Sequence, residues 1–194
     1  MIQPFKILLL SIGILSSVSA CQTVSKATST VGAWVGLGDQ SAKIPQVDKK
    51  GTVDMSKTTL EQAQQLALQM PRDHWVYLEN DQQGIYQLQN KSQTGQILTF
   101  KLNCKIATQK SGFTLQDAEG KVLLKSQDAT AGAIQFLLDN KNYGDPFAEI
   151  NPQHLARFKT DLKKTKVIKI FNASKLYAFQ NGKAEQLEKP ISCL

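Results

Sequence analysis

Two histidines, His74 and His154, are the only imidazole groups in the chain, and imidazole is the side chain best suited to general base catalysis near neutral pH. A nucleophilic hydrolase needs such a base beside a nucleophile and a third, orienting group. The sequence contains no Gly-x-Ser-x-Gly elbow, no His-Glu-x-x-His motif and no phosphate-binding loop. We therefore predict a protein that is not an enzyme and binds no cofactor. A pair of carboxylates from distant positions remains the alternative, because two acids that act together need no fixed spacing in the sequence.

The N-terminus has the pattern of an export signal. An apolar run over residues 7–15 is too short to cross a bilayer hydrocarbon core of about 30 Å as an ordinary helix. The run leads into the tetrapeptide Val-Ser-Ala-Cys, which ends at Cys21 and resembles the lipobox of bacterial lipoproteins. This resemblance implies a signal peptide over residues 1–20 and a covalent lipid on Cys21. Because Gln22 follows instead of Asp, it also implies an outer-membrane anchor with the domain facing the periplasm. The alternative is an ordinary secreted protein.

The three cysteines predict one disulfide. Lipidation of Cys21 would leave Cys104 and Cys193 as a pair in an oxidising compartment. Closing a loop of that size contributes about 4 kcal/mol on the chain-entropy model. Two free buried thiols are the alternative. Neither cysteine has a second cysteine or a histidine at ligand spacing, so we predict no metal site.

The chain is basic, with a formal charge of +7, of which Lys6 would leave with the signal peptide. A concentration of positive side chains lies near the C-terminal third, and it consists of Arg157, Lys159, Lys163, Lys164, Lys166 and Lys169. This basic cluster is suited to anionic envelope material such as lipid head groups, lipopolysaccharide phosphates or acidic glycan. Its alternative role is the solvated face of an amphipathic helix. Export makes nucleic acid an unsuitable partner.

The composition divides the mature chain into two parts. Residues 21–57 are rich in Ser, Thr, Gly, Lys and Asp, which is typical of a flexible tether. Residues 58–194 show the periodicities of a single folded domain. This domain opens with a helix, because Thr58 and Glu61 have capping-box spacing and Pro71 ends the pattern. The apolar face expected of this helix consists of Leu60, Ala63, Ala67 and Met70.

Period-two alternation dominates the rest of the domain. It is clearest over residues 96–106, where Cys104 falls on the apolar side. The other expected strands cover residues 75–78, 85–88, 113–115, 122–124, 134–138, 167–171 and 176–179, with a closing edge segment over 187–193. Asn181-Gly182 predicts a hairpin turn, and Asn151-Pro152 predicts the start of a second helix.

Many short strands with about two helices predict an α+β domain with an antiparallel sheet or sandwich. The run from Phe136 to Tyr143, followed by residues 158–164 and a strand, resembles periplasmic β-sandwich proteins of the invasion-associated locus B type. That resemblance implies a sandwich.

These observations lead to one functional hypothesis and two alternatives. The hypothesis is an envelope-anchored lipoprotein that presents a small non-catalytic domain to another envelope protein or to an anionic polymer. The first alternative is a periplasmic inhibitor or immunity-type protein, since small stapled domains suit that task. The second is a cell-envelope hydrolase.

Overall fold

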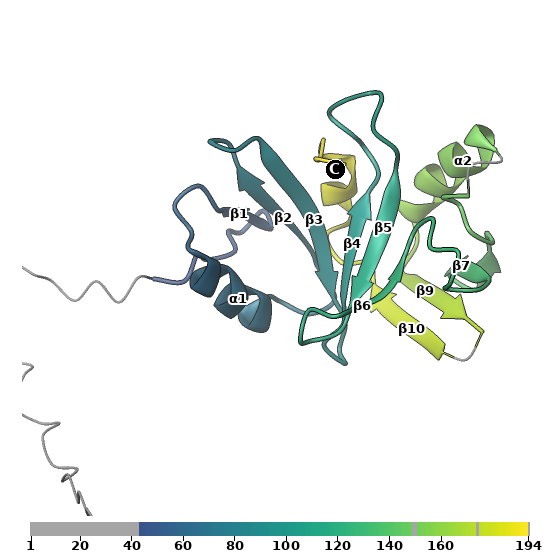
Figure 1. Ribbon diagram of the computed structural model, residues 1–194, viewed down its shortest axis with the longest axis horizontal. Helices are drawn as coiled ribbons and strands as arrows, with labels where there is room; N and C mark the ends of the chain where they lie inside the picture. The colour runs from purple at the N-terminus through teal and green to yellow at the C-terminus, as the bar shows by residue number, and fades with distance from the viewer. Residues whose placement is uncertain (1–42, 149–150, 174, 194) are drawn as a thin grey trace, which may run out of the picture. The chain divides into compact units, whose positions relative to one another are not determined.

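The computed structural model describes residues 43–148, 151–173 and 175–193 (Figure 1). The predicted signal peptide, Cys21 and residues 22–42 of the predicted tether lie outside these residues. The elements, in chain order, are β1 (Thr52–Asp54), α1 (Leu60–Gln69), β2 (Trp75–Asn80), β3 (Ile85–Lys91), β4 (Ile97–Lys101), β5 (Gly112–Gln116), β6 (Val122–Lys125), β7 (Ile134–Leu138), β8 (Lys141–Asn142), α2 (Pro152–Leu162), β9 (Val167–Asn172), β10 (Lys175–Gln180) and the 3₁₀-helix η2 (Ala184–Glu188). No helix in this described part of the chain is long and apolar enough to cross a membrane.

The strands form two sheets, and the α+β class with antiparallel sheets is confirmed. Sheet 1 has six strands in the order β1-β2-β3-β4-β5-β6, and sheet 2 has four in the order β10-β9-β7-β8. All neighbouring pairs are antiparallel except β1 with β2. Short turns join β2 to β3, β3 to β4 and β5 to β6, as alternating sequences with local turn signals favour, whereas α1 lies between β1 and β2 and residues 102–111 connect β4 to β5.

The main core lies between the inner faces of the two sheets. Phe100 of β4 and Phe113 of β5 contact Phe136 of β7, with ring centroids 6.1 and 4.9 Å apart. Phe158 of α2 lies edge-on to both Phe100 and Phe136, so the second helix also packs into this core. Offset and edge-to-face geometries of this kind add to the stabilisation from buried apolar area. The arrangement is sandwich-like.

A second, smaller core lies on the outer face of sheet 1, where α1 packs. Leu66 and Met70 of α1 contact Val76 of β2 and Ile97 of β4, and Val53 of β1 completes the cluster. In Figure 1, α1 lies beside β1, β2 and β3, away from α2. Within α1, every residue of which is described, Leu66 is the only buried side chain, and the buried Met70 follows as the C-cap, so the opposite side of α1 is exposed.

The folded unit begins earlier than the predicted boundary at residue 58. Residues 43–57 are not a flexible tether: Val53 is fully buried in β1, and Met55, Ile44 and Val47 pack against the small core. The prediction was wrong here because polar composition obscured a three-residue strand. A single buried valine in a parallel pair with β2 gives no periodic signal.

The capping box of α1 forms one residue later than predicted. The Thr59 side chain accepts a hydrogen bond from the Gln62 backbone N–H at 3.2 Å, and the Gln62 side chain accepts one from the Thr59 backbone at 2.8 Å. The pattern of Thr58 and Glu61 is equally suitable in sequence, but the packing of Leu66 and Met70 selects the other register. Leu60, expected on the apolar face, is 77% exposed.

Two further expectations were wrong in detail. The strand predicted over residues 96–106 ends at Lys101, and Ile106 is exposed. Beyond Lys101 the chain turns away to pair with the C-terminal segment through an isolated bridge between Cys104 and Ile191. Asn181-Gly182 does not form a hairpin turn, because Asn181 is buried and its side chain makes three tertiary hydrogen bonds.

The start of α2 is as predicted. The Asn151 side chain accepts hydrogen bonds from the backbone N–H groups of Gln153 and His154, and Pro152 occupies the first turn. The hairpin of β5 and β6 is also confirmed, with its turn held by the Asp117 side chain, which accepts a hydrogen bond from the Lys121 backbone at 2.8 Å.

Candidate binding groove

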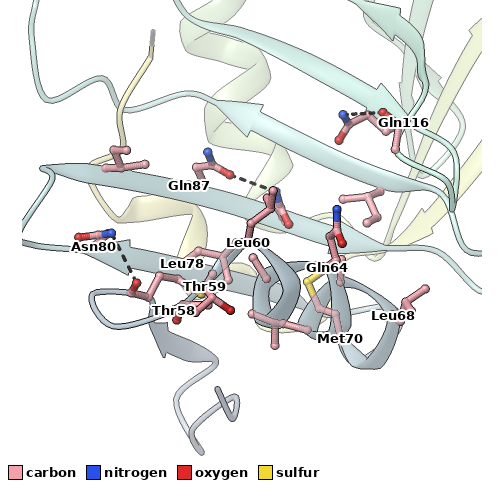
Figure 2. Close-up of a pocket in the computed structure, with 18 of the residues that line it drawn as sticks. Thr58, Thr59, Leu60, Gln64, Leu68, Met70, Leu78, Asn80, Gln87 and Gln116 are labelled. Atoms are coloured by element: carbon pink, nitrogen blue, oxygen red, sulfur yellow. Dashed lines mark hydrogen bonds between the residues drawn. The ribbon is translucent and has the colours of Figure 1, made fainter. Parts of the chain in front are cut away.

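A groove of about 600 Å³ lies between α1 and the outer face of sheet 1 (Figure 2). Helix α1 forms one wall, β3 with its neighbours forms the floor, and the β5–β6 turn closes the far side. The volume falls in the range of about 300–1,000 Å³ that is usual for ligand sites in proteins.

Two rows of side chains run along this groove. Leu60, Gln64 and Leu68 are four residues apart on α1, so they form one stripe along the exposed side of the helix, about 12 Å long. Residues Ile85, Gln87 and Gln89 alternate on β3, so they share one face of the strand and span about 13 Å. The helix row and the strand row are therefore of nearly equal length.

The two rows also run in the same direction. At the start of the groove, Ile85 pairs with Asn80, whose side chain donates to the Met55 carbonyl just before α1. At the other end, the ammonium group of Lys91 donates to the Ala67 and Leu68 carbonyls at 2.9 and 2.7 Å. One end of β3 is thus fixed to the C-terminal end of α1, and the other end pairs with Asn80, which bonds to the segment before α1. Lys91 is buried, and this burial lowers its pKa, with Arg72 lowering it further.

The groove is almost uncharged in a protein that is otherwise rich in charge. Of the lining residues in the described part of the chain, Glu119 alone is acidic or basic. The other lining side chains are uncharged, mostly aliphatic or amide with two threonines and two methionines, and Leu60, Leu68 and Ile85 are exposed by 77%, 61% and 40%. Gln89 donates a hydrogen bond to the Gln87 side chain at 3.2 Å, which leaves further donor and acceptor positions on both amides.

The sequence carries a signal for this site in both α1 and β3. In β3 the outward residues are Gln87 and Gln89, where a solvated strand face in a chain with 20% charged residues would be expected to carry Lys or Glu. On α1 the spacing of Leu60, Gln64 and Leu68 marks a second stripe besides the one that packs. Only the packing of Leu66 and Met70 shows which stripe remains outside.

The basic cluster predicted from sequence is divided among several local contacts. Lys159 donates to the Leu102 carbonyl, and burial lowers its pKa. Lys163 forms an ion pair with Glu188 at 2.7 Å, and Lys169 donates to the Asn140 side chain at 2.7 Å. Arg157, Lys164 and Lys166 remain exposed. Half of the predicted anionic-contact surface is therefore engaged within the protein.

The predicted partners Cys104 and Cys193 are joined in a disulfide, with Cα atoms 5.4 Å apart and 89 residues of sequence separation. The bond fastens the C-terminal segment beside the end of β4, where Ile191 accepts a hydrogen bond from the Lys105 backbone at 2.9 Å. Cys193 is buried, so the cross-link forms part of the core wall.

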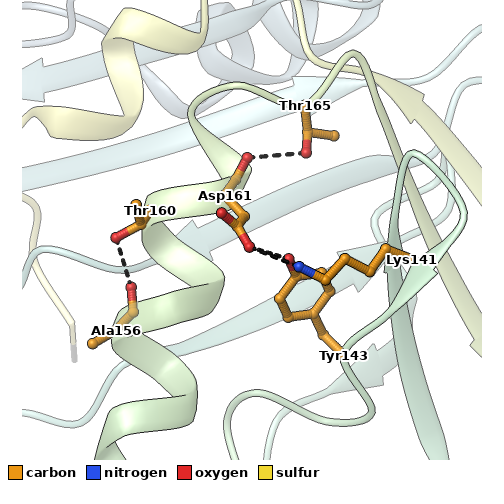
Figure 3. Close-up of polar contacts among 6 residues, drawn as sticks. All are labelled: Lys141, Tyr143, Ala156, Thr160, Asp161 and Thr165. Atoms are coloured by element: carbon orange, nitrogen blue, oxygen red, sulfur yellow. Dashed lines mark hydrogen bonds and ion pairs between the residues drawn. The ribbon is translucent and has the colours of Figure 1, made fainter.

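A second polar arrangement, on α2 and β8, fixes structure (Figure 3). Tyr143 donates to the Asp161 carboxylate, and Lys141 forms an ion pair with the same oxygen at 3.2 Å. The bond from Tyr143 and the contact with Lys141 lower the pKa of Asp161, while Tyr143 and Asp161 raise the pKa of Lys141. Both groups are thus held charged near neutral pH, the opposite of what proton transfer requires.

The two histidines occupy separate elements. His154 stacks on Tyr143, with ring centroids 6.3 Å apart, at the start of α2. His74 precedes β2, is exposed, and has Nδ1 2.7 Å from the Arg72 carbonyl. In the described part of the chain, no group of three or more His, Cys, Asp or Glu side chains is arranged to hold a metal ion.

Comparison with known proteins gives one match. The model of the YfjT family matches residues 73–186, a segment that runs from just before β2 into η2 and leaves out both α1 and Cys193. No curated protein and no solved structure matches the chain. Because the family model covers more than half of the sequence, this chain belongs to the YfjT family.

Proposed function

We propose that this protein is a lipid-anchored, non-catalytic binding protein of the bacterial cell envelope that holds its partner in the groove between α1 and sheet 1. The lipobox-like sequence ending at Cys21 supports the anchor and the outer-membrane location. A disulfide between Cys104 and Cys193 is consistent with an oxidising compartment such as the periplasm.

One observation carries the proposal: exposed aliphatic side chains are concentrated on both sides of one concave surface. Leu60, Leu68 and Ile85 belong to the large apolar side chains that are exposed in the described residues, and all three line this groove. A concave apolar surface with a few polar groups is the usual form of a binding site.

The basic cluster is the weaker candidate for the working surface. Lys159 and Lys169 donate to oxygen atoms of the same chain, and Lys163 pairs with Glu188. Contact with an anionic polymer would have to compete with these bonds. We therefore assign binding to the groove and leave the cluster a role in solubility.

The test is site-specific photocrosslinking of the full-length protein in native envelopes. A photoreactive benzoylphenylalanine replaces Gln83, an exposed side chain that lines the groove. The matched control carries it in place of Leu176, which is 57% exposed on β10 and does not line the groove. We expect a discrete adduct from position 83 that is absent from position 176.

Equal adduct yields at the two positions, or no adduct from position 83, would overturn the assignment of the groove. A separate fractionation with a Cys21→Ser variant tests the anchor: we expect the variant to leave the outer membrane fraction. Retention of the variant in that fraction would contradict a lipid anchor without affecting the crosslinking result.

A further inference from the structure

We propose that the groove binds an extended polypeptide segment of about four residues, whose aliphatic side chains occupy the two ends of the groove. This inference rests on the proposed function, because it names the chemical class of the partner. It follows from the length of the groove, the chemistry along it, and its lack of charge.

The length and shape fit an extended chain. Ile85, Gln87 and Gln89 line the groove at alternate positions, so the groove follows β3 for about 13 Å. Four residues of extended polypeptide span about the same distance. The row on α1 lies alongside this strand over its whole length, so a linear ligand would contact both walls throughout.

The middle of the groove matches the peptide bond. Each residue of an extended chain offers one N–H donor and one carbonyl acceptor. An amide side chain carries both functions, so Gln64, Gln87 and Gln89 can donate to a carbonyl and accept from an N–H of the same segment. A lipid acyl chain would leave these amide groups without partners, which is costly once water is excluded.

The ends of the groove are apolar. Leu60 and Ile85 lie at one end, and Leu68 and Ile97 lie at the other. Two methionines, Met55 and Met70, line the same surface, and their flexible thioethers can adapt to side chains of different shape. Aliphatic side chains of a bound segment would be buried at both ends.

Charge complementarity excludes ionic ligands from this site. Among the described residues that line the groove, Glu119 is the only charged one, so none of them offers a cation to a phosphate or a carboxylate. These same lining residues include no aromatic ring on which a sugar could stack. An uncharged polypeptide segment is the class that satisfies both the amides and the aliphatic ends.

The experiment uses a phage library of random twelve-residue peptides, panned on the purified full-length protein. Selected peptides are synthesised, and their dissociation constants are measured by fluorescence anisotropy. We expect selected sequences to contain two aliphatic positions about three residues apart and no net charge between them.

Three variants identify the site and the chemistry. Ile85→Lys, at an exposed position, places a charge in the apolar end and should weaken binding at least tenfold, while Leu176→Lys on β10 should change it less than twofold. Gln87→Leu removes donors and acceptors but keeps an apolar shape, so peptide binding should weaken about tenfold. An acyl chain would instead bind this variant more tightly.

The outcomes separate this inference from the proposed function. Failure of every peptide to bind, or stronger binding of phosphatidylcholine vesicles to Gln87→Leu, would overturn the polypeptide assignment. The photocrosslink from position 83 would then still stand as evidence for the groove. Peptides whose binding is reduced equally by Leu176→Lys and Ile85→Lys would also contradict the inference.

Discussion

The indole Nε1 of Trp75 donates a hydrogen bond at 2.5 Å to the side-chain oxygen of Asn181, 106 residues further along the chain. The amide nitrogen of Asn181 in turn donates to the Leu162 and Thr165 carbonyls at 2.7 and 2.8 Å, where α2 ends. One buried side chain therefore connects sheet 1, the end of α2 and the end of β10.

Replacing Asn181 should be among the more destabilising single polar changes in this protein. Asn181→Ala removes the buried acceptor of the Trp75 N–H and the side-chain donor to two carbonyls, which should lower the free energy of unfolding by about 3 kcal/mol or more. Urea denaturation followed by Trp fluorescence measures it. Gln65→Ala, an exposed position on α1, is the control and should change stability by less than about 0.5 kcal/mol. Equal effects of the two variants would contradict the role of Asn181.

The second prediction concerns Lys91, which holds the C-terminal end of α1 against the sheet. Lys91→Met keeps a similar volume but removes both bonds to the Ala67 and Leu68 carbonyls. Backbone hydrogen exchange in the last turn of α1 should accelerate about tenfold, equivalent to about 1.4 kcal/mol of local opening. The amides of β7, in the other sheet, are the internal control. Unchanged exchange in α1 would show that packing of Leu66 and Met70 alone fixes the helix.

The third prediction concerns the disulfide between Cys104 and Cys193. A double replacement by alanine should lower the free energy of unfolding by about 4 kcal/mol, because the bond closes a long loop in the unfolded chain. Urea denaturation with and without reducing agent measures this. The reducing agent should destabilise the natural protein and leave the double variant unchanged. A natural protein that is indifferent to reduction would contradict the prediction.

The fourth prediction concerns alkaline pH. Burial raises the pKa of Tyr77 from 10.0 to about 12, and its hydroxyl donates to the Pro190 carbonyl at 2.8 Å. Because the folded state holds this proton more tightly, the stabilisation is complete below pH 10 and is lost as the pH rises towards 12. Tyr77→Phe should therefore flatten the fall of the urea midpoint between pH 10 and 12. An equally steep fall in the variant would assign the loss to other groups.

How far the sequence predicts the fold depends on whether the relevant signal is local. The hairpin of β5 and β6 and the start of α2 at Asn151 are local, since their turn and capping residues bond to neighbours a few positions away. Asn181-Gly182 has an equally strong local signal for a hairpin turn. The Asn181 side chain instead accepts a hydrogen bond from the buried indole of Trp75. Local preferences of this size are overridden when a buried polar group would otherwise be left without a partner.

The sequence by itself determined the α+β class, the cysteine pair and most strand positions, because alternation and residue type are properties of short segments. Tertiary structure alone decided the candidate groove. Helix α1 has two apolar stripes, and only its packing through Leu66 and Met70 leaves Leu60 and Leu68 exposed, facing β3. Which face of a helix is covered depends on contacts between segments far apart in the chain, and no periodicity within the helix records them.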